Sequence, residues 1–160
     1  MIFVTVGSMM PFDRLIRAAD AWAREYAEQE VVAQIGGGSY LPNHMRWQRM
    51  LLPSEFRRAV QDACVLVAHA GMGSFFVAME IGKPIVLVPR FAAKGEHTTD
   101  HQVHTVQWLR QKPGVYVAMS DDDLADAINR ALVERNRVDD SFCTVAPQPF
   151  LSKVRQFLLT

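Results

Sequence analysis

Short apolar runs recur along the chain and are separated by segments with helical periodicity. Four runs of four or five residues predict buried strands at residues 2–6, 31–35, 64–68 and 85–88. Three of them show no alternation of apolar and polar residues, which is typical of parallel strands covered on both faces. Weaker strands are predicted at residues 50–52 and 115–117.

Helical patterns fill the gaps between these runs. Apolar residues recur three or four positions apart over residues 12–26 and 124–132, which predicts amphipathic helices. Ser120 can cap the second of them. Residues 75–81 are apolar almost all round, so we expect a buried helix that Gly82 ends. Strands that alternate with helices predict an α/β fold, with a Rossmann-like parallel sheet and helices on both faces.

The length of 160 residues indicates one domain, which we assign to residues 1–136. The polar, proline-containing stretch that follows predicts a linker, and apolar residues near the end recur with helical spacing. Residues 137–160 are therefore interpreted as a linker and a C-terminal amphipathic helix. This helix either packs back on the domain or docks on a partner or a membrane. No apolar stretch approaches the roughly 20 residues of a membrane-spanning helix.

Charge and cysteine content narrow the range of partners. Seventeen Lys and Arg residues balance seventeen Asp and Glu residues, so no overall positive field attracts nucleic acid. Any anion must be held locally, by backbone amides or single side chains. The two cysteines, Cys64 and Cys143, cannot form a metal site alone and fit a reducing cytosol.

Glycine follows three of the predicted strands, and the third case is the most informative. Gly71, Gly73 and Ser74 join a buried strand to a buried helix. Free amides of a first helical turn, the helix dipole and the Ser74 hydroxyl favour an anion there. The alternative is a tight turn with Ser74 as the helix cap. The P-loop lysine is absent and Phe76 occupies the third small position of a dinucleotide fingerprint, so a diphosphate without a dinucleotide fits better.

Two groups of polar residues offer further chemistry. Asp100 and Gln102 follow a predicted strand and suit sugar hydroxyls. His97, His101 and His104 have a spacing that can align them on one helix face, which raises a zinc site, but no HExxH motif or nearby cysteine accompanies them. An ordinary polar helix start is the alternative. His69 ends an apolar strand, either as a buried structural histidine, as a phosphate donor or as a candidate catalytic base.

Four motifs in a fixed order carry a resemblance to a known family. They are Phe3-Val4-Thr5-Val6-Gly7-Ser8, His69-Ala70-Gly71-Met72-Gly73-Ser74, Gly82-Lys83-Pro84-Ile85-Val86-Leu87-Val88-Pro89-Arg90, and Gly95-Glu96-His97 with Asp100-His101-Gln102. Together they resemble the C-terminal domain of glycosyltransferase family 28 over about residues 1–132. Within it they are most similar to the small, donor-binding subunits of split bacterial capsule or exopolysaccharide glycosyltransferases. The resemblance implies one Rossmann-like half of a GT-B fold.

The resemblance also implies which residues bind the donor. The implied diphosphate contacts are Gly71, Met72, Gly73 and Ser74, helped by Gly7, Ser8 and His69. The segment 52–56, which contains Phe56, matches a loop that reads the uracil ring. Gln102, with Asp100 and His101 beside it, matches the positions that bind the sugar. Relatives place a ribose-binding glutamate where this chain has Val77. Glu80, one helical turn later, reaches the ribose only in a shifted helix and is otherwise a surface residue.

The implied activity is hexosyl transfer from a UDP-sugar to a lipid-linked saccharide in capsule or exopolysaccharide synthesis. Helix amides and Ser74 would stabilise the leaving UDP, without a metal ion or a cofactor. The general base and the acceptor site would belong to a membrane-anchored partner subunit, which would hold this cytoplasmic chain at the inner face of the membrane. Residues 9–12 and the C-terminal helix are candidate docking surfaces.

Two other functions stay open. One is a non-catalytic scaffold or regulatory module for a membrane glycosyltransferase, and the other is a zinc hydrolase that uses the three histidines. The sugar, the acceptor, the stereochemical outcome and homo-oligomer formation are also undetermined by the sequence.

Overall fold

The computed structural model describes residues 1–134 and 155–156. Its six strands form one parallel sheet in the order β3-β2-β1-β4-β5-β6. The elements in chain order are β1 (Ile2–Thr5), α1 (Asp13–Glu25), β2 (Val31–Gln34), β3 (Arg46–Gln48), α2 (Pro53–Asp62), β4 (Val65–His69), α3 (Met72–Ile81), β5 (Ile85–Val88), η1 (Ala92–Lys94), α4 (His101–Leu109), β6 (Val115–Val117) and α5 (Asp122–Val133).

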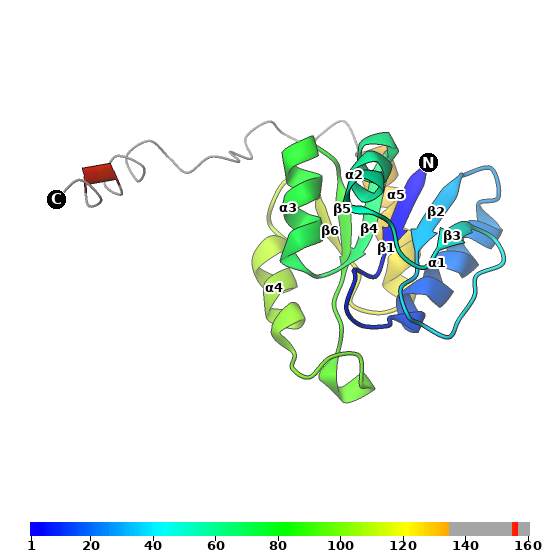
Figure 1. The fold of residues 1–160 in the computed structure, drawn as a ribbon, viewed down its shortest axis with the longest axis horizontal. Coiled ribbons are helices and arrows are strands. Elements are labelled where there is room, and N and C mark those ends of the chain that lie inside the picture. The colour runs from blue at the N-terminus through cyan, green and yellow to red at the C-terminus, as the bar shows by residue number, and fades with distance from the viewer. Residues whose placement is uncertain (135–154, 157–160) are drawn as a thin grey trace.

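The strand order places a topological switch point between β1 and β4. Strand β1 pairs with β2 on one side and with β4 on the other, so the chain leaves the two central strands toward opposite halves of the sheet. Thr5 lies opposite Ala68 at the carboxyl ends of β1 and β4. In open parallel sheets a crevice opens at such a point. The loops after β1 and β4 therefore face one another across it (Figure 1).

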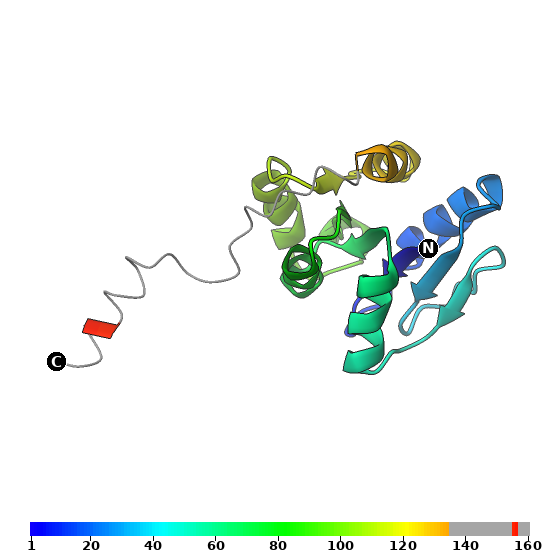
Figure 2. The same ribbon diagram turned by 90° about the horizontal axis from the view of Figure 1, so that it is seen from above.

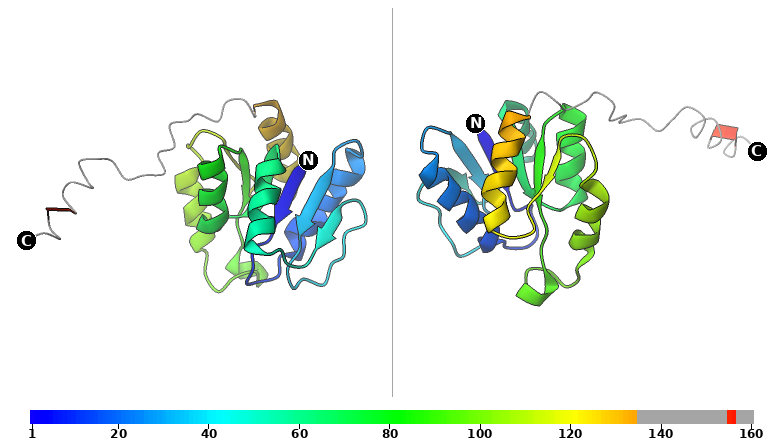
Figure 3. Two further views of the ribbon diagram at one scale, coloured as in Figure 1. Left: turned by 45° about the horizontal axis from the view of Figure 1, so that its top comes forward. Right: turned by 180° about the vertical axis from the view of Figure 1, so that it is seen from behind.

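Helices cover both faces of the sheet, as the apolar strands predict. Helices α1 and α5 lie on one face, and α2, α3 and α4 lie on the other (Figures 2 and 3). Each layer encloses its own apolar core, one around Leu15, Trp22 and Ile128 and the other around Phe75 and Leu109. The sheet is thus buried on both sides, which explains its unbroken apolar strands.

Three local predictions needed correction. The strand expected at residues 50–52 is formed by Arg46–Gln48 instead, because Leu52 already caps α2 and Pro53 starts that helix. The segment 52–56 is accordingly a helix start rather than a loop. The helix expected at 75–81 begins at Met72, and it is not buried all round, since Phe76 is 55% exposed.

Other predictions are confirmed. Gly82 ends α3 in the left-handed conformation. Ser120 accepts a hydrogen bond from the Asp123 amide and donates its own amide to the Asp123 carboxylate, just before α5. Within the described part of the chain, no helix has the length and apolar character needed to cross a membrane. The predicted linker and C-terminal helix lie outside the described residues, apart from Arg155 and Gln156.

Candidate functional site

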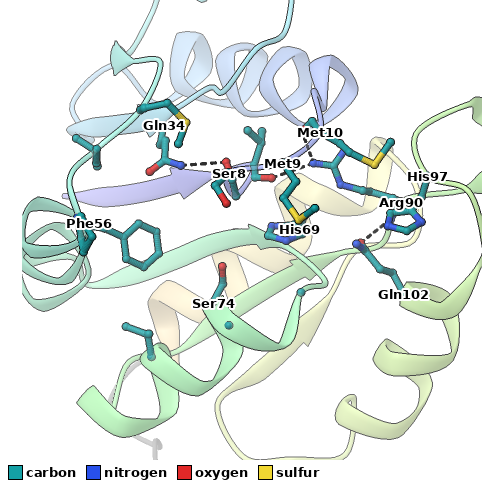
Figure 4. Close-up of a pocket in the computed structure, with 18 of the residues that line it drawn as sticks. Ser8, Met9, Met10, Gln34, Phe56, His69, Ser74, Arg90, His97 and Gln102 are labelled. Atoms are coloured by element: carbon teal, nitrogen blue, oxygen red, sulfur yellow. Dashed lines mark hydrogen bonds between the residues drawn. The ribbon is translucent and has the colours of Figure 1, made fainter.

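A pocket of about 850 Å³ opens at the switch point (Figure 4). The loops after β1, β4 and β5 and the starts of α2, α3 and α4 surround it. Its lining residues are Val6, Gly7, Ser8, Met9, Met10, Gln34, Met50, Leu51, Pro53, Phe56, Arg57, His69, Gly71, Gly73, Ser74, Val77, Arg90, His97, His101 and Gln102.

The first turn of α3 forms the middle of this pocket. Gly71 is the N-cap residue and its extended backbone leads directly into the helix. The first-turn amides of Met72, Gly73 and Ser74 have no hydrogen-bond acceptor among the described residues, as expected at a helix start. The Ser74 side chain is likewise without a partner there, although the residue is only 7% exposed. This turn therefore presents several unused donors and the positive end of a helix dipole.

Glycine is required at two places beside this turn and not at a third. A Cβ atom on Gly7 or on Gly71 would overlap the imidazole ring of His69, and Gly7 also has a φ of +78°. Gly73 is different, because a Cβ atom there would meet no heavy atom within 4 Å. The open space at Gly73 lies in the pocket, where a ligand can approach the backbone closely.

His69 is a partly buried side chain on the pocket floor, and it is neutral at pH 7. Burial lowers its pKa from 6.5 to about 4, and the nearby charges of Arg90 and His97 act in the same direction. The Thr5 backbone has a smaller effect that favours the protonated form, and the buried Nδ1 atom has no hydrogen-bond partner among the described residues. At neutral pH the uncharged ring has one nitrogen that can donate a hydrogen bond and one that can accept it. It adds no positive charge to the pocket.

Arg90 ties the loop after β1 to the rest of the site. The residue is 2% exposed, and its guanidinium donates to the carbonyl oxygens of Val6 (2.9 Å), Met10 (2.7 Å), Pro11 and Glu96 (3.3 Å). It forms no ion pair with any carboxylate in the described part of the chain. Arg90 is thus a buried cation that shapes the pocket wall and adds positive potential to it.

One end of the pocket is polar. The Gln102 side-chain oxygen accepts the Arg90 amide at 3.1 Å, which leaves the Gln102 amino group available to a ligand. The Thr99 amide donates to Nδ1 of His97 at 3.3 Å, so neutral His97 carries its proton on Nε2. His101 lines the same end, with its Nδ1 2.9 Å from the Thr99 hydroxyl. Figure 4 shows Arg90, His97 and Gln102 together at this end.

The opposite end is mostly apolar, with Arg57 beside it in its pair with Glu80. Met50, Leu51, Pro53, Phe56 and Val77 line it, and Phe56 lies away from Gln102 and His97 in Figure 4. The Phe56 ring also packs edge-on against Phe3 of β1, with ring centroids 5.5 Å apart. This contact with the core fixes the position of the Phe56 ring. This end suits a flat, uncharged group.

The charges of the lining are all of one sign. Arg57 and Arg90 contribute positive charge, and none of the described residues that line the pocket is an aspartate or a glutamate. The Arg57 charge is balanced by Glu80, but Arg90 has no such partner among the described residues. A pocket with unused donors, the Arg90 guanidinium and no carboxylate in its described lining favours an anion over a cation.

Comparisons with known proteins agree with this geometry. A family model described as the glycosyltransferase family 28 C-terminal domain matches residues 1–140. The chain belongs to this family. The curated UDP-N-acetylglucosamine transferase subunit ALG13 of Homo sapiens is 30% identical over 97 residues, which is 54% of this chain and 8% of that protein. The Mus musculus protein of the same name matches equally. The chain thus spans a small part of these relatives.

Solved structures of glycosyltransferases share the fold of this family 28 domain. The Acinetobacter baumannii MurG structure has a TM-score of 0.64 at 15% identity, over 97% of this chain and 49% of that one. The SnogD structure from Streptomyces nogalater has a TM-score of 0.61 at 20% identity, over 99% of this chain and 43% of that one. The chain therefore corresponds to a Rossmann-like half of a GT-B fold.

Most of the predicted donor-binding residues of this family 28 domain line one pocket. They are Gly7, Ser8, Phe56, His69, Gly71, Gly73, Ser74, His101 and Gln102. Three others lie outside it. Met72 is the first residue of α3, and its side chain packs against the apolar core. The Asp100 carboxylate accepts the Ala92 amide at 2.8 Å. Glu80 is an exposed residue that pairs with Arg57 at 2.8 Å.

The structure also adds residues that the motifs did not assign. Arg90 is the most important, and its signal in the sequence was an arginine two residues after an apolar strand. Gln34, the polar residue of the predicted run 31–35, is the last residue of β2, and its side-chain amide donates to the Gly7 carbonyl at 3.0 Å. The second glycine loop, by contrast, serves packing. A Cβ atom on Gly38 would overlap the Asp13 carboxylate, which accepts hydrogen bonds from the Ser39 amide and hydroxyl.

The three histidines do not gather as a metal site. Helix α4 begins at His101, so His97 precedes the helix and does not share a face with His101 and His104. The rings of His97 and His101 pack edge to face at 4.4 Å. No group of three or more His, Cys, Asp or Glu residues in the described part of the chain could hold a metal ion.

Proposed function

We propose that this chain is the donor-binding subunit of a two-chain glycosyltransferase and that it binds the UDP-sugar in the pocket at the switch point. The observation that carries the proposal is the first turn of α3. It combines unused amides, an unpartnered Ser74 hydroxyl and open space at Gly73, in a pocket lined by no described carboxylate. These features fit a diphosphate held without a metal ion.

The two ends of the pocket orient the donor. With the diphosphate on the α3 turn, the nucleoside extends toward Phe56 and Val77, and the sugar extends toward Gln102 and His97. The flat base then contacts apolar side chains, and the sugar hydroxyls meet amide and imidazole groups. UDP is favoured over other nucleotides because the curated relatives are UDP-N-acetylglucosamine transferase subunits.

Catalysis follows from charge stabilisation. The acceptor oxygen forms a bond to the anomeric carbon while the bond from that carbon to the β-phosphate oxygen breaks. Negative charge grows on the diphosphate, where the amides of α3 and the Ser74 hydroxyl already point, and the buried charge of Arg90 adds to the field. The acceptor proton passes to a general base on a partner subunit. His69 is a poor base for it, because its pKa is held near 4.

The partner completes the proposal. The resemblance of the motifs extends it to a membrane-anchored acceptor-binding subunit, a lipid-linked saccharide acceptor, and a place in capsule or exopolysaccharide synthesis at the cytoplasmic face of the membrane. One feature of the surface supports a docking surface beside the pocket. Met9 is 93% exposed at the pocket rim, whereas Phe12 from the same candidate segment is buried in the core.

Titration calorimetry with UDP tests the proposal. The Ser74→Ala variant removes a hydroxyl donor to a charged group, so we expect at least about tenfold weaker UDP binding. Ser39→Ala is the matched control, since Ser39 bonds Asp13 and lies outside the pocket. Its UDP affinity should equal that of the wild type. If the wild-type chain binds no UDP, or if Ser74→Ala binds it equally well, the proposed site is wrong.

Reconstitution with the acceptor-binding subunit separates catalysis from scaffolding. Ser74→Ala should abolish most of the sugar transfer by the two-chain complex. Transfer that is unaffected by this substitution would make the chain a scaffold and not the donor-binding subunit.

A further inference from the structure

We propose that Gln34 reads the base of the nucleotide, and that its side-chain oxygen selects a pyrimidine with a ring N–H, such as uracil, over cytosine. This inference rests on the proposed function, because it concerns the nucleoside end of the same pocket. It gives the proposed preference for UDP a physical basis in one side chain.

The strand register places the Gln34 side chain at the Phe56 end of the pocket. The Phe56 ring packs against Phe3 of β1, and Phe3 lies opposite Val32 of β2. Gln34 is two residues after Val32, so its side chain points to the same face of the sheet, nearer to the carboxyl ends of the strands. Gln34 and Phe56 both line the pocket, and Figure 4 shows them on one side of it, away from Gln102.

The orientation of the Gln34 amide is fixed by its partner. Its nitrogen donates to the Gly7 carbonyl at 3.0 Å. Because a carbonyl oxygen can only accept, the nitrogen and not the oxygen of the side chain faces Gly7. The Gln34 side-chain oxygen has no hydrogen-bond partner among the described residues, although the residue is only 4% exposed. This end of the pocket therefore contains an oriented, largely shielded acceptor that a ligand can use.

The position of Gln34 in the sheet suits the base rather than the ribose. Strand β4 leads into the α3 turn that is proposed to hold the diphosphate, and β1 lies between β4 and β2. Neighbouring strands are about 4.8 Å apart, so Gln34 lies about 10 Å across the sheet from the end of β4. The ribose is attached to the diphosphate and stays beside α3, whereas the base extends one group further, toward β2.

The neighbouring side chains at this end offer different contacts. Leu51 and Phe56 have no polar side-chain atom and can only pack against the base. Arg57, which pairs with the exposed Glu80, carries only donors, so it can contact a carbonyl oxygen of the base but not a ring N–H. The Gln34 oxygen supplies the matching acceptor.

This acceptor discriminates between uracil and cytosine because the two bases differ at ring nitrogen 3. Uracil carries a hydrogen on this nitrogen and can donate it to the Gln34 oxygen. Cytosine has a lone pair there, so both groups are acceptors and the Gln34 oxygen is left unpaired. A shielded polar group without a partner weakens binding of the ligand that fails to satisfy it. We therefore expect UDP to bind at least about tenfold more tightly than CDP.

Titration calorimetry of the full chain with UDP and CDP tests this inference. Gln34→Met has a similar size but lacks the oxygen, so the ratio of its two dissociation constants should fall to within about threefold. This ratio is informative even if the lost bond to Gly7 weakens both ligands. Gln48→Met is the matched control, since Gln48 is exposed on the edge strand β3 and lies outside the pocket. It should keep the wild-type ratio.

Two outcomes would overturn the inference and leave the proposed function standing. One is a wild-type chain that binds CDP as tightly as UDP, and the other is a folded Gln34→Met variant that keeps the full preference for UDP. If neither nucleotide binds to the wild type, the proposed function itself fails, so the failures are distinguishable.

A modified ligand covers the case in which the Gln34→Met variant does not fold. UDP with a methyl group on nitrogen 3 of the uracil ring lacks the donor that Gln34 is proposed to read. The wild-type chain should bind this ligand at least about tenfold more weakly than UDP. Equal binding of the two ligands would overturn the inference.

Discussion

The ionisation of His69 is open to direct measurement and decides what the pocket offers an anion. The ring lies between Gly7 and Gly71, and burial lowers its pKa to about 4. In the unfolded chain the ring is solvated and its pKa is about 6.5. The folded protein therefore resists protonation of a group that the unfolded chain protonates readily.

The sign and size of the effect on stability follow from linkage. Between pH 6.5 and pH 4 the unfolded chain binds a proton at His69 that the folded chain does not, so the free energy of unfolding falls as the pH is lowered. The pKa difference corresponds to about 3 kcal/mol in total. About 2 kcal/mol of this is lost between pH 7 and pH 5. The lowered pKa values of Asp13 and Asp20 act at more acidic pH, below this window.

Urea denaturation at pH 7 and pH 5 measures this difference, with His69→Asn as the variant that lacks the titrating ring. The wild type should lose about 2 kcal/mol more than the variant over this range. Imidazole chemical shifts from NMR provide a reading that does not depend on the variant folding well, and they should show a neutral His69 down to pH 5. A midpoint near 6.5 in the NMR titration, or equal losses for the two proteins, would refute the buried neutral ring.

Two further sets of substitutions test the first turn of α3 and the buried Arg90 guanidinium. Gly73→Ala should leave the melting temperature unchanged but weaken UDP binding by about tenfold, because the added methyl group enters the space for the ligand. Gly37 is the control, since its Cβ would also meet open space but the residue lies outside the pocket. Gly37→Ala should change neither the UDP affinity in calorimetry nor the melting temperature. Arg90→Met should lower the free energy of unfolding by about 3 kcal/mol in urea, because the buried Val6 carbonyl and the part-buried Met10 carbonyl lose their donor. Arg90→Lys should recover part of this loss. A Met variant as stable as the wild type would contradict the role of Arg90 in holding the loop after β1.

Five of the six strands could be predicted because each is a local apolar run. β1, β2, β4, β5 and β6 lie within a residue of the expected positions, since parallel strands buried on both faces leave a continuous apolar signal. The third strand, Arg46–Gln48, could not be predicted in this way. It is an edge strand, all three of its side chains are exposed, and its residues carry no such signal.

The hydrogen-bond donors at the start of α3 could also be predicted, because the amides and the Ser74 hydroxyl come from consecutive residues. Residues whose role depends on distant parts of the chain were harder to predict. Arg90 bonds Val6 and Met10, which lie 84 and 80 residues away in sequence. Asp100 was expected to face the sugar, but its carboxylate binds the Ala92 amide across a loop that sequence spacing does not describe. Glu80 likewise forms an ion pair with Arg57, a residue of another helix, and this pairing could not be predicted from local sequence.

The most direct measurement of the central claim is a crystal structure of the full chain grown with UDP. The account predicts that the diphosphate oxygens accept hydrogen bonds from the amides of Gly73 and Ser74 and from the Ser74 hydroxyl, with the uracil toward Phe56. A structure in which UDP binds away from α3, or in which side chains fill the space at Gly73, would contradict it.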